Sequence, residues 1–244
     1  MSKSEISFLI GLIILLLLAT FLPSITQDQN YHNFADQEVL FSINNGSDTL
    51  SNLIFIMFGF MGLINFYNNK YIKISNSFSV IVTLFFISII LTGLASSYYH
   101  LSPNDFTLVF DRLAISLVFT NILAMLTCIR ISERFGVYTL AELIIFAPLT
   151  VLIWNYNGNL TPYIVLQFGG IILVILTLLL TKAKKQSPCF TSLIILYGLA
   201  KVTEFYDAQI FILSQNLISG HTLKHLIAGL ALIIFISALK VKRT

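Results

Sequence analysis

Charged side chains are scarce in this chain: only 10% of its 244 residues are Asp, Glu, Lys or Arg. A soluble domain usually carries about 25% charged residues. The sequence therefore supplies too little polar surface to cover a water-soluble fold of this length. Composition alone excludes a soluble protein.

Cysteine is nearly absent as well, with only Cys128 and Cys189 in the chain. Two thiols are too few for a disulfide framework. We expect both to be buried and to pack as small apolar side chains. The sequence also has no internal repeat, heptad pattern or low-complexity tract.

Hydrophobic residues, by contrast, make up 57% of the chain, and the mean hydropathy is +0.88. They recur in runs close to the roughly 20 residues that an α-helix needs to cross a bilayer. The sequence predicts eight such spans, at about 6–23, 50–68, 77–99, 107–129, 138–154, 162–181, 189–213 and 219–239. The expected fold class is an all-α polytopic membrane protein in a lipid bilayer.

The first span shares one feature with a signal peptide, because Lys3 precedes its apolar run. The run is long, however, and it ends at 19–23 without a small-x-small cleavage site. We therefore expect an uncleaved N-terminal transmembrane helix at residues 1–27 and a seven-span membrane domain at residues 28–244.

Basic residues in the connections fall on one side of this topology. The connections 24–49, 100–106, 155–161 and 214–218 contain no Lys or Arg. The remaining connections and the two ends contain Lys3, Lys70, Lys73, Arg130, Arg134, Lys182, Lys184, Lys185, Lys240, Lys242 and Arg243. This asymmetry predicts a multi-pass protein of the cell membrane with both termini in the cytoplasm. The net charge of +3 then reflects orientation and gives no support to nucleic-acid binding.

Histidines are the first candidates for function, because ionisable groups within spans are costly and rare. His221 and His225 lie four residues apart at the start of the last span, so both imidazoles share one helix face. Helices with this spacing can hold zinc, although the pair can also simply bond to neighbouring helices. His100 ends the third span on the same predicted outer side. Three ligands with a fourth position for water are typical of catalytic zinc, and that side offers no cysteine.

Two more polar residues fall at a similar predicted depth. Ser96 lies one turn before His100, and Asp111 lies about one turn into the fourth span. A carboxylate beside zinc-bound water can accept a proton and pass it to a leaving group. A hydroxyl can donate a hydrogen bond to a developing oxyanion. The alternatives are an ion pair with Arg112 or a helix cap for Asp111, and Ser97 in place of Ser96.

Strings around these residues resemble the alkaline ceramidases and the wider group of seven-span proteins that includes the adiponectin and progestin receptors. The strings are SNLIF at 51–55, SSYYHLSP at 96–103, FDRL at 110–113 and SGHTLKH at 219–225. The resemblance runs from about residue 28 to the C-terminus and implies seven spans around an intramembrane zinc.

The resemblance also implies a role for each candidate. His100, His221 and His225 would be the zinc ligands, Asp111 the proton shuttle and Ser96 the oxyanion helper. The implied reaction is hydrolysis of the ceramide amide to a sphingoid base and a fatty acid.

Two departures from the family pattern stand out. The chain has an extra N-terminal span, and the stretch QDQNYHNFADQEVLFSINNGSD lacks the Asp-Trp pair of the family's calcium site. The resemblance therefore gives no support to calcium, although Asp28, Asn30, Asp36 and Glu38 have oxygen atoms that suit a hard cation. Such a loop suits bacterial members of the group, whose substrate need not be ceramide.

The expected function is zinc-dependent hydrolysis of an amide in a membrane lipid that enters from the bilayer. One alternative is a non-catalytic receptor or sensor on the same scaffold. Another is a transporter in which Lys201, Glu204, Asp207 and Lys224 form an ion path. The presence of Asp111 and Ser96 favours the hydrolase, since a structural zinc needs neither.

The charged stripe along 201–207 is open to two interpretations. Glu204 or Asp207 can accept the spare ring N–H of a metal histidine, or the stripe is an ion-pair ladder between helices. Glu142, near the cytoplasmic end of the fifth span, has no evident partner in the sequence.

Overall fold

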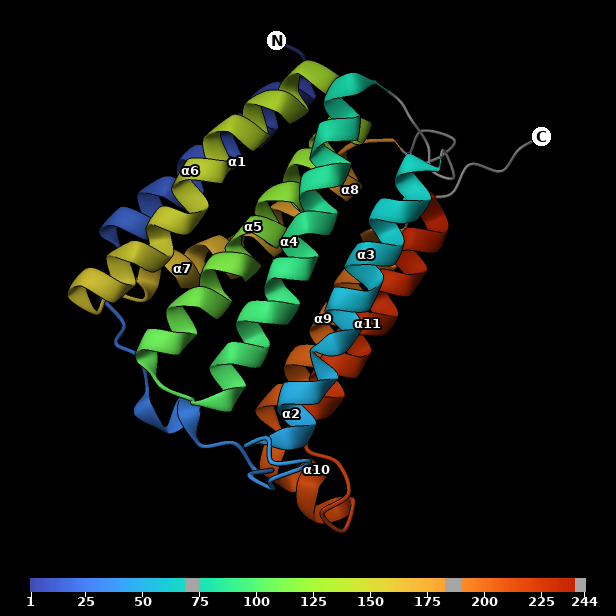
Figure 1. The fold of residues 1–244 in the computed structure, drawn as a ribbon. Coiled ribbons are helices and arrows are strands. Elements are labelled where there is room, and N and C mark those ends of the chain that lie inside the picture. Colours follow the sequence, from blue (N-terminus) through green and yellow to red (C-terminus); the bar gives the residue numbers. More distant parts are fainter. Residues whose placement is uncertain (69–74, 183–189, 240–244) are drawn as a thin grey trace. The chain divides into compact units, whose positions relative to one another are not determined.

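The computed structural model describes residues 1–68, 75–182 and 190–239, which form helices joined by loops, with no β-strand among them (Figure 1). Seven helices of this part of the chain are long and apolar enough to cross a membrane. They are Lys3–Phe21, Gly46–Tyr67, Asn76–Leu101, Asp105–Arg130, Glu133–Asn157, Thr161–Leu180 and Gly220–Leu239. The predicted fold class, an all-α polytopic membrane protein, is confirmed.

The expected span at 189–213 is helical but divided. Helix α9 (Phe190–Phe205) ends before Tyr206, and α10 (Asp207–Leu213) follows it. The 16 residues of α9 are about 24 Å long, which is less than the roughly 30 Å of a hydrocarbon core. This segment is therefore not one of the seven long spans.

Several predictions fall on residues outside the described ranges. Among them are Lys70, Lys73, Lys184, Lys185, Cys189, Lys240, Lys242 and Arg243. The predicted orientation rests largely on these positions and stays a prediction.

The chain divides into two compact units that share α4 (Asn76–Leu101) and α5 (Asp105–Arg130). The first unit comprises the described parts of 1–27, 73–85 and 112–187, and the second those of 28–72, 86–111 and 188–244. All candidate zinc and catalytic residues belong to the second unit.

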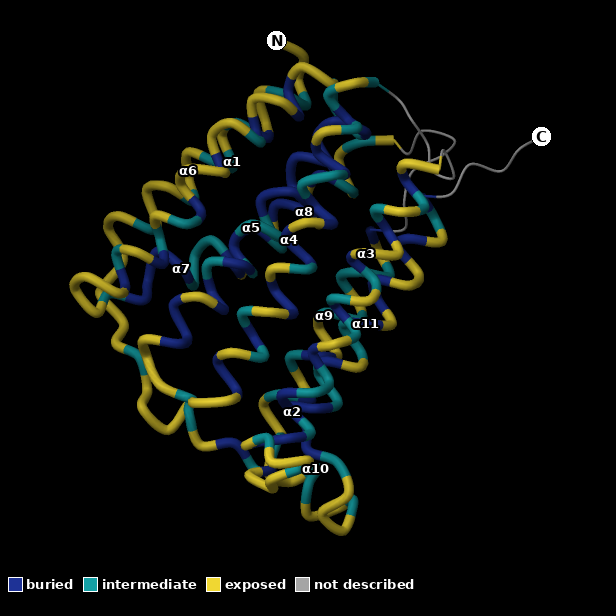
Figure 2. The backbone as a smooth tube through the Cα atoms, viewed as in Figure 1, coloured by how far each residue is buried: buried dark blue, intermediate teal, exposed yellow. Residues whose placement is uncertain are grey.

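In the first unit, α1 (Lys3–Phe21) contacts α7 (Thr161–Ile164), the π-helical turn η2 (Val165–Gly169) and α8 (Gly170–Leu180). Phe8 is the one buried residue of α1 and packs edge-to-face on Phe135 of α6 (Glu133–Asn157). The rest of α1 is largely exposed (Figure 2). An apolar helix with so little protein contact is stable only with lipid on its remaining faces.

In the second unit, α11 (Gly220–Leu239) packs along α9, α3 (Leu53–Tyr67) and α2 (Gly46–Ser51). Gly229 permits the close approach to α3, because a Cβ atom there would lie 2.3 Å from Ile54 Cδ1. Small residues at helix contacts are typical of membrane bundles, where backbones approach closely.

The connection between the first helix and α2 is anchored within the second unit. His32, at the end of the 3-10 turn η1 (Gln29–His32), bonds Tyr99 Oη through Nδ1 at 2.9 Å and Asp105 Oδ1 through Nε2 at 3.1 Å. Asp28 and Asp36 each accept a hydrogen bond from a backbone N–H two residues later. The loop is thereby held against the turn that joins α4 to α5.

Candidate metal centre

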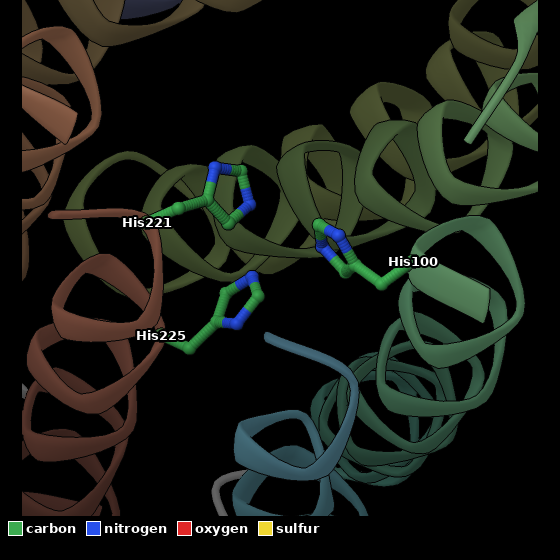
Figure 3. A group of neighbouring side chains, drawn as sticks. All are labelled: His100, His221 and His225. Atoms are coloured by element: carbon green, nitrogen blue, oxygen red, sulfur yellow. The ribbon is translucent and has the colours of Figure 1, made fainter. Parts of the chain in front are cut away.

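Three buried histidines converge in the second unit. His100 is the next-to-last residue of α4, and His221 and His225 lie in the first two turns of α11 (Figure 3). Each offers a ring nitrogen, and these nitrogens all lie within 4.8 Å of one another. Their exposed fractions are only 1%, 4% and 3%. The predicted meeting of the three imidazoles is therefore confirmed as a geometry that can hold one metal ion.

The donor atoms suit a metal. Each histidine contributes one ring nitrogen, and the three nitrogens lie within 4.8 Å of one another. Imidazole nitrogens are common zinc ligands, and three of them can bind one ion together. The residues present therefore fit a bound metal.

Ser51 fixes the tautomer of His225. Its Oγ donates a hydrogen bond to the backbone oxygen of Asp48 at 2.9 Å, and it lies 2.7 Å from His225 Nδ1. Because that hydroxyl proton is already used, Oγ can only accept from a protonated Nδ1. His225 Nε2 is then left with a free lone pair, which is the form a metal ligand needs.

The start of α11 is capped by its own sequence. Ser219 precedes the helix, and its Oγ accepts from the backbone N–H of Thr222 at 2.9 Å, which is an N-cap interaction. The Asp48 carboxylate accepts from both hydroxyls, those of Ser219 and Thr222. These bonds tie α2 to α11 and fix where the helix with two of the three histidines begins.

Asp207 and Gly220 set the position of His221. Asp207 accepts the backbone N–H of His221 through Oδ1 at 2.7 Å and that of Ala35 through Oδ2 at 2.9 Å. A Cβ atom on Gly220 would lie 2.1 Å from the backbone oxygen of Thr203, so only glycine fits. Asp207 therefore binds the backbone N–H of His221, and the prediction that it accepts from a histidine ring is not confirmed.

Phe34 covers the centre from the loop. Its ring centroid lies 4.7 Å from that of His100 and 4.6 Å from that of His221, and the side chain is 6% exposed. Asn45, from the same loop, donates through Nδ2 to the backbone oxygen of His100 at 2.7 Å. The imidazoles thus lie under an apolar lid that lowers the local dielectric constant.

The charged stripe forms an ion-pair ladder. Glu204 binds Lys201 Nζ at 2.6 Å and Lys224 Nζ at 3.0 Å, which joins α9 to α11. Lys224 Nζ also lies 2.8 Å from His221 Nε2. The Glu204 carboxylate therefore forms ion pairs with Lys201 and Lys224, and it is linked to the histidine centre through Lys224.

Ser96 and Asp111 are both buried, with exposed fractions of 5% and 7%. Ser96 lies one turn before His100 on the same face of α4. Ser96 lies about 8 Å along the helix axis from the end of α4, and Asp111 lies about 9 Å from the start of α5. The two residues are therefore at a similar depth.

The alternative to Ser96 was Ser97, whose hydroxyl donates to the backbone oxygen of Thr49 at 3.2 Å. Arg112 donates to Gln27 and lies over the Trp154 ring, and its ion pair with Asp111 stays an alternative.

Two important contacts of the centre were not predicted from the sequence. Ser51 carried a weak signal, because it begins the SNLIF string, but nothing local links it to a residue 174 positions later. Phe34 carried none, since a phenylalanine in a polar loop has no pattern that points to histidines.

Comparison with protein-family models finds no match to this chain, and comparison with curated proteins finds none either. A functional assignment therefore has to rest on the residues of the centre and on their geometry.

Proposed function

We propose that this membrane protein is a zinc-dependent intramembrane hydrolase that cleaves the amide bond of ceramide or of a related membrane lipid. The observation that carries the proposal is the buried cluster of His100, His221 and His225 at the ends of membrane helices. A set of three imidazoles favours zinc over calcium or magnesium, which bind oxygen ligands.

His100, His221 and His225 would hold the zinc ion, which would supply a Lewis acid and would make water at the site more acidic. The Asp111 carboxylate accepts the proton that the attacking water loses. The water oxygen joins the carbonyl carbon, and the Ser96 hydroxyl donates a hydrogen bond to the carbonyl oxygen while it is negatively charged. Asp111 then delivers its proton to the amide nitrogen as the C–N bond breaks, which releases a fatty acid and an amine.

The depth of the cluster favours a lipid substrate. His100 ends α4 and His221 begins α11, so the imidazoles lie near the limits of two membrane spans. The hydrocarbon core is about 30 Å thick, and the polar region adds several ångströms on each side. An amide that joins an acyl chain to a headgroup lies at this boundary, whereas a water-soluble substrate would have to pass the Phe34 lid.

The sequence strings support the same assignment. SNLIF includes Ser51, which orients His225, and SSYYHLSP, FDRL and SGHTLKH contain the five residues of the proposed mechanism. On this basis we propose that the chain is related to the alkaline ceramidases.

The test is hydrolysis of an acyl-labelled ceramide by purified protein, with zinc content measured on the same preparations. Wild type is expected to release labelled fatty acid. Asp111→Asn is expected to retain zinc and to lose at least about 100-fold in rate, because a general base contributes roughly 10²–10⁴-fold. Ser97→Ala serves as the matched control for Ser96→Ala, which is expected to lose rate without losing zinc.

The outcomes separate the proposed hydrolase from the receptor alternative. Zinc in wild type with no release from ceramide or from a panel of N-acyl lipids would contradict hydrolysis and favour a sensor. Equal rates for wild type and Asp111→Asn would contradict the proposed proton shuttle.

A further inference from the structure

Glu142 is a carboxylate at membrane depth in the first unit. It lies nine residues after the start of α6, which corresponds to about 14 Å along the helix. The side chain is exposed, and it has no hydrogen bond or ion pair within the described part of the chain. An ionisable residue in a span is costly and marks a functional site by default, with a partner to be identified.

Glu142 lines a cavity of about 270 Å³ between α1, α5, α6 and the segment formed by α7, η2 and α8. The other lining residues are apolar, among them Leu12, Leu16, Phe146 and Leu166, with the exception of Thr150. The Thr150 hydroxyl donates to the backbone oxygen of Ala147 at 2.7 Å, so its proton is already used. The Glu142 carboxylate is therefore the charged group that this cavity offers to a ligand.

The cavity is held open by its surroundings. At one end of α1, Glu5 accepts from Ser132 Oγ at 2.8 Å, and at the other end Thr161 Oγ1 donates to the backbone oxygen of Pro23 at 2.7 Å. Both helix ends are thus tied to the segments that face the cavity. Pro148 interrupts the hydrogen bonds of α6, and η2 is a π-helical turn, a type of irregularity that is frequent at functional sites.

We propose that this cavity binds a single-chain amphiphile with a protonated primary amine, the alkyl chain among the leucines of α1 and the ammonium group at Glu142. A carboxylate at the edge of an apolar cavity pairs best with a cation that can donate hydrogen bonds. A long-chain alcohol offers a hydrogen bond without the charge, and a fatty acid brings a like charge. The size is near the lower limit of small-ligand pockets, about 300 Å³, which suits one alkyl chain.

The inference does not depend on the proposed hydrolase, because the cavity and the histidine centre belong to different units. A long-chain amine is also the class of product that ceramide hydrolysis releases. Binding and hydrolysis are therefore measured separately, and either one can fail alone.

Trp154 provides the readout. It is the single tryptophan of the chain and follows Thr150 by one turn on α6. The probes are dodecylamine, dodecanol and dodecanoic acid, each with a terminal bromine that quenches tryptophan fluorescence at short range. They are titrated into the full chain in lipid nanodiscs.

We expect the brominated amine to quench Trp154 at a concentration at least tenfold below that of the alcohol, with the acid weaker still. Glu142→Gln is expected to remove the preference for the amine, whereas Glu133→Gln, an exposed carboxylate of the same helix outside the cavity, keeps it. Ala19→Phe fills the cavity and is expected to weaken quenching by all three probes.

Equal quenching of wild type by amine, alcohol and acid would overturn the proposal. So would a Glu142→Gln protein that keeps the tenfold preference for the amine. Far-UV circular dichroism of each variant verifies that the helices are intact, and unchanged spectra assign any loss of preference to the carboxylate.

Discussion

The histidine centre and Glu142 are two places where ionisable side chains lie within apolar helices. They differ in their burial and in their contacts with other residues. The three imidazoles are buried, and residues from three segments, namely Asn45, Ser51 and Asp207, bond to them or to their backbone. Glu142 is exposed at the edge of an apolar cavity, without a partner in the described ranges. The protein thus supplies three ligands that can hold a metal ion, whereas the partner that we propose for the carboxylate is a molecule from outside.

The largest expected effect comes from removing a ligand of the centre. His225→Ala leaves two imidazoles, and we expect zinc content to fall from about one ion per chain to near zero. The matched control is His32→Ala, because His32 contacts Tyr99 and Asp105 outside the cluster. Zinc content is measured by inductively coupled plasma mass spectrometry. Similar zinc loss in both variants would show that the centre is not specific.

The next effect concerns the backbone that carries the histidines. Gly220→Ala places a Cβ atom against Thr203 and Asp207, and we expect a loss of about 1–3 kcal/mol in stability, as for other overpacked sites. Gly198→Ala is the control, since a Cβ atom there meets nothing within 4 Å and alanine favours the helix. Thermal unfolding in detergent compares the two variants. Equal melting temperatures would contradict the close approach of α11 to α9 and α10.

A smaller effect is expected from the hydroxyl behind His225. Ser51→Ala removes the acceptor of the Nδ1–H, and we expect zinc affinity to fall about 10–100-fold, as is usual when an outer partner of a metal histidine is lost. Competition with a zinc chelator measures the affinity. Ser97→Ala removes a hydroxyl that bonds the same helix, α2, and is expected to leave the affinity unchanged.

The smallest effect has the opposite sign. Lys224 places an ammonium group 2.8 Å from His221 Nε2, where it competes with a metal ion for the nitrogen and repels its charge. We expect Lys224→Met to raise zinc affinity about tenfold, or about 1.4 kcal/mol. Lys201→Met, which loses only a contact to Glu204, is expected to change it less. Weaker zinc binding by Lys224→Met would reassign the lysine as a support of the centre.

Features that depend on local patterns were predictable from the sequence. Apolar runs gave the membrane helices, and the four-residue spacing of His221 and His225 together with the position of His100 gave the cluster. Hydrogen bonds between residues far apart in the sequence were not predictable. Ser51 meets His225 and Asp207 meets Ala35 over more than 170 residues of separation.

The break at Tyr206 in the helix expected at 189–213 was also not predicted from the sequence. The apolar run of this segment is interrupted by Lys201, Glu204 and Asp207, but no proline or glycine marks the break at Tyr206. Gly220 packs against the backbone at Thr203 and Asp207, so the end of α9 and the start of α10 are shaped by a contact with a later helix. Hydropathy reports membrane affinity and carries no information about such contacts.

The decisive experiment for the metal centre is X-ray absorption at the zinc edge on purified wild type and on a His221→Ala, His225→Ala double variant. We expect one zinc per wild-type chain, bound by three imidazole nitrogens at about 2.0–2.1 Å, and no zinc in the double variant. Wild-type protein that stays free of zinc in zinc-containing buffer, or a double variant that retains the same spectrum, would contradict this expectation.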